Sequence, residues 1–191
     1  MDIIAVIGKT SSAKDLIGKY LREKYGFGDI VSYTTRKMRD YEKNGVQHKF
    51  IDDDEMDRVL KEEDILAYTE NAMTGIRYCA SLQCATSDKC VYIINPNGLK
   101  WGIENGGFND VDNLYTIYVY CSEERIMEFS SERGDDLDTF MKRLESERKE
   151  FDDYFCSHDW NYCIYNLKDK EYLFEQADEI MASIGYEKLE S

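Results

Sequence analysis

Five consecutive apolar residues, mostly β-branched, stand near the start of the chain at positions 3–7. A short run of this kind is typical of a strand buried on both faces, as in a parallel sheet. Gly8 ends the run, and the sequence KTSSAKD separates it from the helical spacing of Leu16, Ile17 and Leu21. The pattern therefore predicts a strand, a turn of small and polar residues, and a helix.

Similar patterns recur along the rest of the chain. Apolar runs predict further strands within residues 30–33, 89–98, 114–121 and 162–166. Residues 54–61 have a helical pattern, Ser122 and Glu123 resemble a helix cap, and an amphipathic helix follows near the C-terminus. The last helix should turn Tyr172, Leu173, Ala177, Ile180 and Met181 toward the core. This alternation predicts an α/β fold with a parallel sheet and helices on both faces.

The turn after the first strand has the context of a phosphate-binding loop, in which backbone N–H groups and a helix N-terminus face an anion. The pattern to match is G-x-x-x-x-G-K-[ST]. Gly8 and Lys14 match it, whereas Ala13 replaces the second glycine and Asp15 replaces the hydroxyl residue that binds Mg²⁺. The candidate loop consists of Gly8, Lys9, Thr10, Ser11, Ser12, Ala13, Lys14 and Asp15. The alternative is an ordinary turn, with Lys14 solvated and Asp15 stabilising the helix N-terminus.

Length and charge narrow the function classes. The chain has 191 residues and a net charge of −15, which argues against a nucleic-acid or anionic-membrane partner. The six cysteines show no C-x-x-C pair and no metal-ligand spacing. Without a signal peptide pattern or an apolar run near 18 residues, we expect reduced thiols in a cytoplasmic protein. A phosphate binder of this composition must gather its few cations locally, so the arginine positions are informative.

Two arginines stand beside hydroxyl residues in the segment SYTTRKMRDYEKNGVQHKF, residues 32–50. Arginine presents a fixed fork of donors that matches phosphate oxygens two at a time, so Arg36 and Arg39 could form an anion clamp. The alternative is a solvated charged loop whose arginines pair with the acidic residues that follow them.

The degraded loop and this segment together resemble the guanylate kinase family, whose pattern reads S-x-T-T-R-x-x-R-x-x-E-x-x-G-x-x-Y-x-F. The residues that match are Ser32, Thr35, Arg36, Arg39, Glu42, Gly45 and Phe50, and His48 stands where the family has Tyr. The resemblance implies that this segment binds the phosphate of a nucleoside monophosphate. If His48 points inward, acceptor affinity should rise as the pH falls from about 8 to 6.

The resemblance extends along nearly the whole chain. Gly75 and Tyr78 match the family's E-x-x-G-N-x-Y-G-[ST], and Glu70 lies near the guanine-contacting glutamate, with an offset of two or three residues. Asn95 replaces a family aspartate, so the accepted base stays open. Arg133 and Arg143 resemble the arginines of the family's lid, and residues 162–166 resemble its last strand, which implies that Asn166 lies on the adenine side.

The fold implied by the resemblance is that of P-loop nucleoside-monophosphate kinases, with an inserted acceptor-binding lobe and a helical lid. One domain over residues 1–191 would comprise a core (1–32, 83–123 and 151–191), an acceptor lobe (33–82) and a lid (124–150). The implied activity is phosphoryl transfer from ATP to a nucleoside monophosphate, most simply GMP or dGMP, by a monomer or homodimer. Lys14, Arg133 and Arg143 would be catalytic, and Asp15 would contact Mg²⁺.

The departures at Ala13, Asp15 and Asn95 leave two functions open. One is an active kinase of reduced activity. The other is a guanylate-kinase-like module that has lost catalysis and holds a nucleotide or a phosphorylated partner. Lys14 and the two lid arginines favour the kinase, since they supply the cations that phosphoryl transfer requires.

Overall fold

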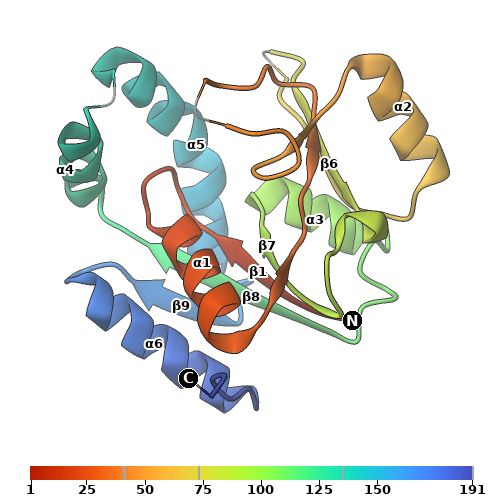
Figure 1. Ribbon diagram of the computed structural model, residues 1–191. Coiled ribbons are helices and arrows are strands. Elements are labelled where there is room, and N and C mark those ends of the chain that lie inside the picture. The colour runs from red at the N-terminus through yellow and green to blue at the C-terminus, as the bar shows by residue number, and fades with distance from the viewer. Residues whose placement is uncertain (41, 73, 135, 191) are drawn as a thin grey trace. The chain divides into compact units, whose positions relative to one another are not determined.

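The computed structural model describes residues 1–40, 42–72, 74–134 and 136–190, and the side chain of Arg133 lies outside this description. The strands are β1 (Asp2–Ile7), β2 (Gly28–Asp29), β3 (Tyr33–Thr34), β4 (Lys49–Phe50), β5 (Ile65–Glu70), β6 (Arg77–Ser81), β7 (Lys89–Ile93), β8 (Asn113–Tyr120) and β9 (Tyr162–Tyr165). The helices are α1 (Lys14–Tyr25), α2 (Asp53–Glu62), the 3-10 turn η1 (Leu82–Cys84), α3 (Pro96–Glu104), α4 (Glu123–Arg133), α5 (Leu137–Ser157) and α6 (Lys170–Ser183) (Figure 1).

The larger sheet has the strand order β2-β7-β1-β8-β9, and its pairs β2–β7 and β8–β9 are parallel. Strand β1 is therefore central, and the side chains of residues 3–7 are fully buried. The apolar run at the start of the chain indicated this position, because a strand covered on both faces needs no polar alternation. The predicted α/β fold with a parallel-strand core is confirmed.

The chain divides into two compact units. One consists of Met1–Ile3, Gly28–Tyr92 and Asn97–Leu114, and the other of Ile4–Phe27, Ile93–Pro96 and Tyr115–Ser191. The predicted division into a core, an acceptor lobe and a lid stays a prediction.

The first unit contains the smaller sheet, with the order β4-β3-β6-β5, and helix α2 packs on it. Met56 and Val59 of α2 are buried against Cys79 of β6. Helix α2 begins at an N-cap, Asp52, whose carboxylate accepts a hydrogen bond from the amide of Glu55 at 2.8 Å. The helical pattern predicted over residues 54–61 is confirmed.

In the second unit, α6 lies against α1 (Figure 1). The rings of Tyr20 and Phe174 stack at 4.0 Å between these helices. Leu173, Ala177, Ile180 and Met181 are buried as the amphipathic pattern predicts, while Tyr172 is only partly buried. The predicted cap is also present, because the hydroxyl of Ser122 accepts a hydrogen bond from the amide of Arg125.

The strand predicted over residues 30–33 is wrong in its position. Strand β2 ends at Asp29 in the larger sheet, and β3 begins at Tyr33 in the smaller one. The apolar residue Ile30 makes only an isolated bridge to Ala85. The apolar run thus marks a passage of the chain from one sheet to the other, and a single-sequence pattern does not distinguish this from a continuous strand.

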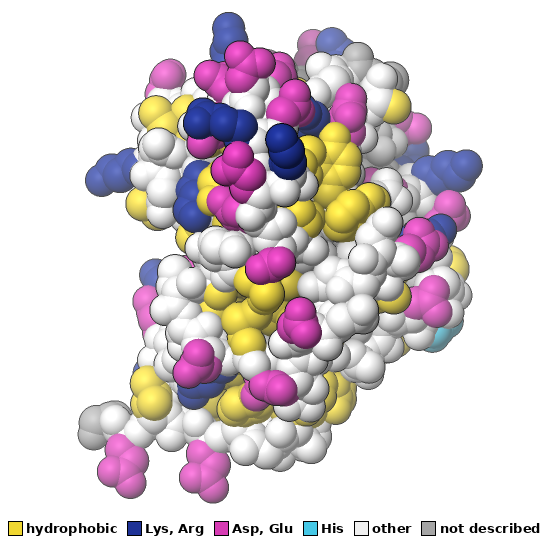
Figure 2. All heavy atoms as spheres, turned by 90° about the vertical axis from the view of Figure 1, so that its right-hand side faces the viewer, with side chains coloured by type: hydrophobic (Ala, Val, Ile, Leu, Met, Phe, Trp, Pro, Cys, Tyr) yellow, Lys and Arg dark blue, Asp and Glu magenta, His cyan; other side chains and the backbone are white. Residues whose placement is uncertain are grey.

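Acidic side chains are spread from top to bottom over the face shown in Figure 2, mixed with lysines and arginines. None of the helices in the described part of the chain is both long enough and apolar enough to cross a membrane. All six cysteines are free thiols.

Candidate active site

The candidate phosphate loop connects β1 to α1. A Cβ atom on Gly8 would lie 2.4 Å from the Ser12 hydroxyl and 2.8 Å from the Val119 carbonyl oxygen, so only glycine fits there. Ser11 and Ala13 both have left-handed backbones, with φ of 59° and 79°. The loop therefore keeps, at Ala13, the conformation that glycine adopts without strain.

The loop lysine lies over the loop. The ammonium group of Lys14 donates a hydrogen bond to the Lys9 carbonyl at 3.3 Å, and its side chain is only 15% exposed. Asp15 differs, because its side chain is 81% exposed and its carboxylate lies 3.7 Å from the Lys14 ammonium. Lys14 is thus not the solvated residue of an ordinary turn, whereas Asp15 is at the surface of the first turn of α1.

Asn166 is buried next to the loop and binds its backbone. It is 1% exposed, its amide nitrogen donates to the Ser12 carbonyl at 3.2 Å, and its oxygen accepts from Arg125 at 3.2 Å. The hydroxyl of Ser12 is buried and has no hydrogen-bond partner within the described residues. Asn166 therefore fixes the loop, and its expected place beside adenine stays a prediction.

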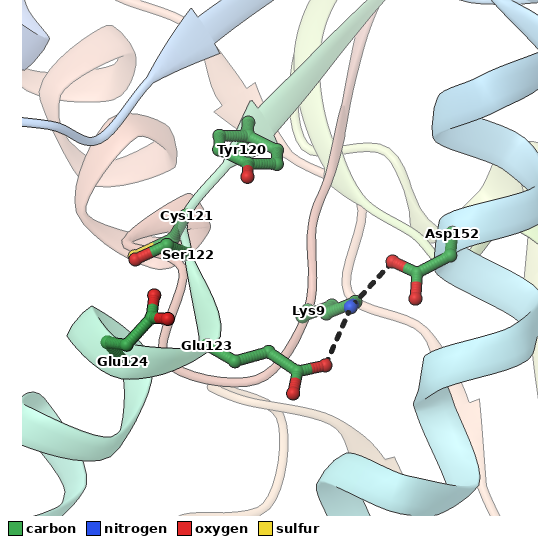
Figure 3. Close-up of a pocket in the computed structure, with 7 residues that line it drawn as sticks. All are labelled: Lys9, Tyr120, Cys121, Ser122, Glu123, Glu124 and Asp152. Carbon is green, nitrogen blue, oxygen red and sulfur yellow. Dashed lines mark hydrogen bonds and ion pairs between the residues drawn. The ribbon is translucent and has the colours of Figure 1, made fainter.

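A pocket next to the loop is lined by residues of β8, of the α4 N-terminus and of α5 (Figure 3). The Lys9 ammonium points into it and pairs with Asp152 at 2.6 Å and with Glu123 at 3.5 Å. Glu123 in turn binds Arg148 at 2.9 Å. The hydrogen bond from Arg148 lowers the pKa of Glu123 against the effect of burial, with help from the charge of Lys9.

Two further contacts tie α5 to the loop region. The backbone N–H of Thr10 donates to a Glu147 carboxylate oxygen at 2.7 Å, and the other oxygen of Glu147 accepts from Nε of Arg143 at 2.8 Å. The predicted lid residue Arg143 thus lies next to a carboxylate that touches the loop. Arg133 is at the end of α4, and its side chain lies outside the described residues.

The predicted acceptor residues gather in the first unit. The Arg36 guanidinium makes two hydrogen bonds to the Glu42 carboxylate, at 2.8 and 3.0 Å, and lies over the Phe50 ring at 5.3 Å. The backbone N–H of Arg39 also donates to Glu42, at 2.8 Å. Glu42 is 7% exposed, and the hydrogen bond from Arg36 lowers its pKa to about 2 despite burial. Glu42 therefore fixes the guanidinium of Arg36 and the backbone at Arg39.

His48 faces the same cluster. Its Nδ1 lies 2.9 Å from the Ser32 hydroxyl, and its ring packs edge-on against Tyr78 with the centroids 5.7 Å apart. Burial lowers the pKa of His48, and the charge of Arg36 lowers it further. The imidazole is then neutral above about pH 6.5, so the gain in acceptor affinity expected between pH 8 and 6 moves to lower pH.

The remaining predicted residues are distributed between the two units. The Thr35 hydroxyl accepts from the amide of Arg77 at 3.0 Å, which joins the acceptor segment to β6. Glu70 ends β5 and accepts a hydrogen bond from the Tyr68 hydroxyl at 2.9 Å. Asn95 lies between β7 and α3 and belongs to the other unit. The roles of these residues in base recognition stay predictions.

Several residues at this site were not predicted from the sequence, namely Arg125, Glu147, Arg148 and Asp152. The local signals were the i,i+4 spacing of Arg143 and Glu147 and the i,i+3 spacing of Glu145 and Arg148, which favour pairing on one helix face. Their contacts with the loop, with Glu123 or with Asn166 join residues far apart in the chain, and periodicity does not indicate such contacts.

The family profile of guanylate kinase matches residues 3–183. This chain belongs to the guanylate kinase family. A curated guanylate kinase of Mycoplasma genitalium is 27% identical over 152 residues, which cover 76% of this chain and 60% of that protein. The guanylate kinase of Fusobacterium nucleatum is 35% identical over 66 residues, covering 35% of this chain and 36% of that protein. The chain therefore aligns with less than two thirds of the length of these guanylate kinases.

The fold also resembles a solved guanylate kinase. The crystal structure of guanylate kinase from Anaplasma phagocytophilum aligns with a TM-score of 0.59 at 21% identity, covering 96% of this chain and 84% of that one. The arrangement of strands and helices is thus that of a guanylate kinase.

Proposed function

We propose that this chain transfers a phosphoryl group from ATP to a nucleoside monophosphate, with GMP or dGMP as the acceptor. Membership of the guanylate kinase family supports this, and so do the two cationic clusters that the chain builds. One cluster is the loop with Lys14, and the other is the pair Arg36 and Arg39 with Ser32 and His48. The enzyme would act on nucleotides in the cytoplasm, as a monomer or homodimer.

The observation that carries the proposal is a pair of contacts made by the phosphate loop. Its Thr10 amide already holds a carboxylate oxygen at 2.7 Å, and the Lys14 ammonium is held over the loop by the Lys9 carbonyl. A carboxylate oxygen and a phosphate oxygen accept hydrogen bonds from the same donors, so an amide that binds the one can also bind the other.

Phosphoryl transfer needs positioning and charge neutralisation more than covalent help from the protein. In the proposed reaction an acceptor phosphate oxygen attacks the γ-phosphorus of ATP, and the bond from that phosphorus to the β-γ bridging oxygen breaks to release ADP. Arg36 and Arg39 would orient the acceptor phosphate. Lys14, Arg133 and Arg143 would neutralise the charge on the transferred group.

The proposed reaction uses Mg²⁺ with ATP, and Asp15 would contact the ion. Mg²⁺ is commonly bound by one or two carboxylates together with substrate phosphates and water. An exposed carboxylate at the first turn of α1 fits that role, because it can turn toward an ion held by phosphates. The ion would shield charge on the phosphates when bound. Among residues 1–40, 42–72, 74–134 and 136–190, no group of three or more His, Cys, Asp or Glu is arranged to hold a metal ion.

We further propose that turnover is lower than in a guanylate kinase with an intact loop, and that the acceptor base is held differently. Ala13 strains the loop, Asp15 adds a negative charge near the phosphates, and Asn95 replaces a carboxylate with an amide. A carboxylate accepts two N–H groups of guanine, whereas an amide offers one acceptor and one donor.

A coupled assay of ADP release tests the proposal. The chain is supplied with Mg²⁺ and ATP and with GMP, dGMP, AMP, CMP and UMP in turn, and the Lys14→Ala variant is the control. We expect release with GMP or dGMP that the control lacks. If no monophosphate supports release but GMP still binds, the binding module is the correct function.

A further inference from the structure

The anion-binding amide of the loop is occupied by the protein itself. The Thr10 N–H donates to Glu147 at 2.7 Å, Thr10 is 6% exposed, and the Glu147 side chain is 18% exposed. The carboxylate oxygen of Glu147 stands where a phosphate oxygen would accept the same hydrogen bond. A nucleotide that binds through this amide must first displace Glu147.

The same carboxylate also engages an arginine of α5. Oε1 of Glu147 accepts from Nε of Arg143 at 2.8 Å, while Oε2 takes the Thr10 amide. Glu147 thus holds at once a loop donor and an arginine that the proposed reaction uses. Both partners can also bind phosphate oxygens, because the guanidinium fork matches phosphate as well as carboxylate and a terminal phosphate carries more charge than a carboxylate.

A second contact holds α5 near the loop independently of that amide. Asp152 lies on the same helix and pairs with the Lys9 ammonium at 2.6 Å (Figure 3). This contact involves the side chain of Lys9 and not the amide of Thr10, so it does not depend on Glu147. Loss of Glu147 alone should therefore leave α5 in place.

We propose that Glu147 is an internal competitor of the nucleotide's phosphates. Its carboxylate occupies the loop until a polyphosphate displaces it, and the displacement releases Arg143 to bind that polyphosphate. The proposal rests on the proposed function. It adds that a nucleotide must displace Glu147 before it binds the Thr10 amide, and that this displacement frees Arg143. A purely structural role for Glu147 makes the opposite prediction, since removal of a structural tie would loosen the loop and weaken anion binding.

The test compares Glu147→Gln with Glu145→Gln. Glu145 lies on the same helix, is 66% exposed and pairs with Arg148, so its substitution removes the same charge without touching the loop. The probe is inorganic tripolyphosphate, which carries the charge of a nucleotide without a base, and its affinity is measured by titration calorimetry. We expect Glu147→Gln to bind it about tenfold more tightly than the parent, the effect of losing a charged hydrogen-bonding competitor. Glu145→Gln should differ from the parent by less than about twofold.

The possible outcomes test the competitor role of Glu147 independently of the proposed kinase activity. Equal affinity in all three proteins, or weaker binding by Glu147→Gln, overturns the competitor role whether or not ADP is released with a monophosphate. Equal tightening in both variants also overturns it, because the effect is then one of net charge. Tighter binding confined to Glu147→Gln supports it, even if the coupled assay shows no ADP release. A thermal melt of each variant checks folding, and we expect unchanged midpoints.

Discussion

The Glu42 carboxylate binds the Arg36 guanidinium through two hydrogen bonds and also accepts the backbone N–H of Arg39. One buried acidic side chain therefore fixes the guanidinium of Arg36 and the backbone at Arg39, while the Arg39 side chain is 44% exposed. A fork held in this way loses less side-chain freedom when it binds a phosphate.

Replacement of Arg36 should weaken acceptor binding. Arg36→Ala removes a charged donor pair, so we expect the affinity for GMP to fall by about 2 kcal/mol or more, roughly 30-fold. Arg36→Lys should recover only part of this, because an ammonium group cannot reproduce the fork. Arg58→Ala is the control, since Arg58 is 65% exposed and pairs with Glu55 on the surface of α2. An unchanged acceptor KM in Arg36→Ala would exclude the clamp.

Glu42 should also make the free energy of unfolding depend on pH in the acidic range. Its pKa is about 2 in the folded chain against an ordinary value of 4.5, so the unfolded chain binds the proton first as the pH falls. The contribution of this group, about 3 kcal/mol, is complete above about pH 5.5 and is lost as the pH falls toward 2.

Urea unfolding from pH 7 to 3 measures this effect. Glu42→Gln should be less stable than the parent at pH 7, and the difference should shrink at pH 3. Glu104→Gln is the matched control, because Glu104 is 61% exposed in a surface pair with Lys100 and such pairs contribute little. A constant difference between Glu42→Gln and the parent across the pH range would contradict the assignment.

His48 should lower the free energy of unfolding at acidic pH, whereas a histidine paired with an acidic group would raise it. Its lowered pKa means that the unfolded chain takes up a proton near pH 6.5 while the folded chain does not. Stability should therefore fall as the pH decreases below about 6.5, and His48→Tyr should remove that dependence. His158→Asn, at the exposed end of α5, is the control. An equal acid slope in the parent and in His48→Tyr would show that His48 is not responsible.

The backbone of Ala13 predicts a gain in stability. A left-handed conformation costs a residue with a Cβ atom about 1 kcal/mol, whereas glycine adopts it freely. Ala13→Gly should therefore raise the free energy of unfolding by about 1 kcal/mol. Ala182→Gly lies in the right-handed helix α6 and should lower it by about the same amount. A destabilised Ala13→Gly would mean that the loop has another conformation.

How much of this could be predicted from the sequence depends on the range of each interaction. The proximity of Arg36, Arg39 and Glu42 could be predicted, because they lie within seven positions of the sequence; their role in binding an acceptor stays a prediction. The central strand was equally predictable, since burial on both faces leaves a continuous apolar run. Helix α3 was not predicted, although Pro96 stands at its first position, where proline is favoured.

The contacts that define the loop's present state could not be predicted. Thr10 and Glu147 are 137 positions apart, and Asn166 and Ser12 are 154 apart. Neither hydrophobic periodicity nor a short motif encodes such pairs, which arise only when the sheet order brings β1, β8 and β9 together. The family pattern indicated the loop and Arg143, but it gave no indication that the side chain of Glu147 contacts both of them.

Asp15 provides the sharpest test of the proposed reaction. Its carboxylate is exposed and lies 3.7 Å from the Lys14 ammonium, so it partly offsets the charge that the phosphates need. Asp15→Ser restores a neutral oxygen ligand for Mg²⁺ and should raise kcat/KM for ATP. The double variant with Ala13→Gly should raise it further, since the loop strain is then also removed. Asp54→Ser, on the surface of α2, removes one acidic charge elsewhere and should leave kcat/KM unchanged. If Asp15→Ser instead abolishes a robust activity, the activity requires the negative charge of this carboxylate at the metal, and the substitution at position 15 is an adaptation.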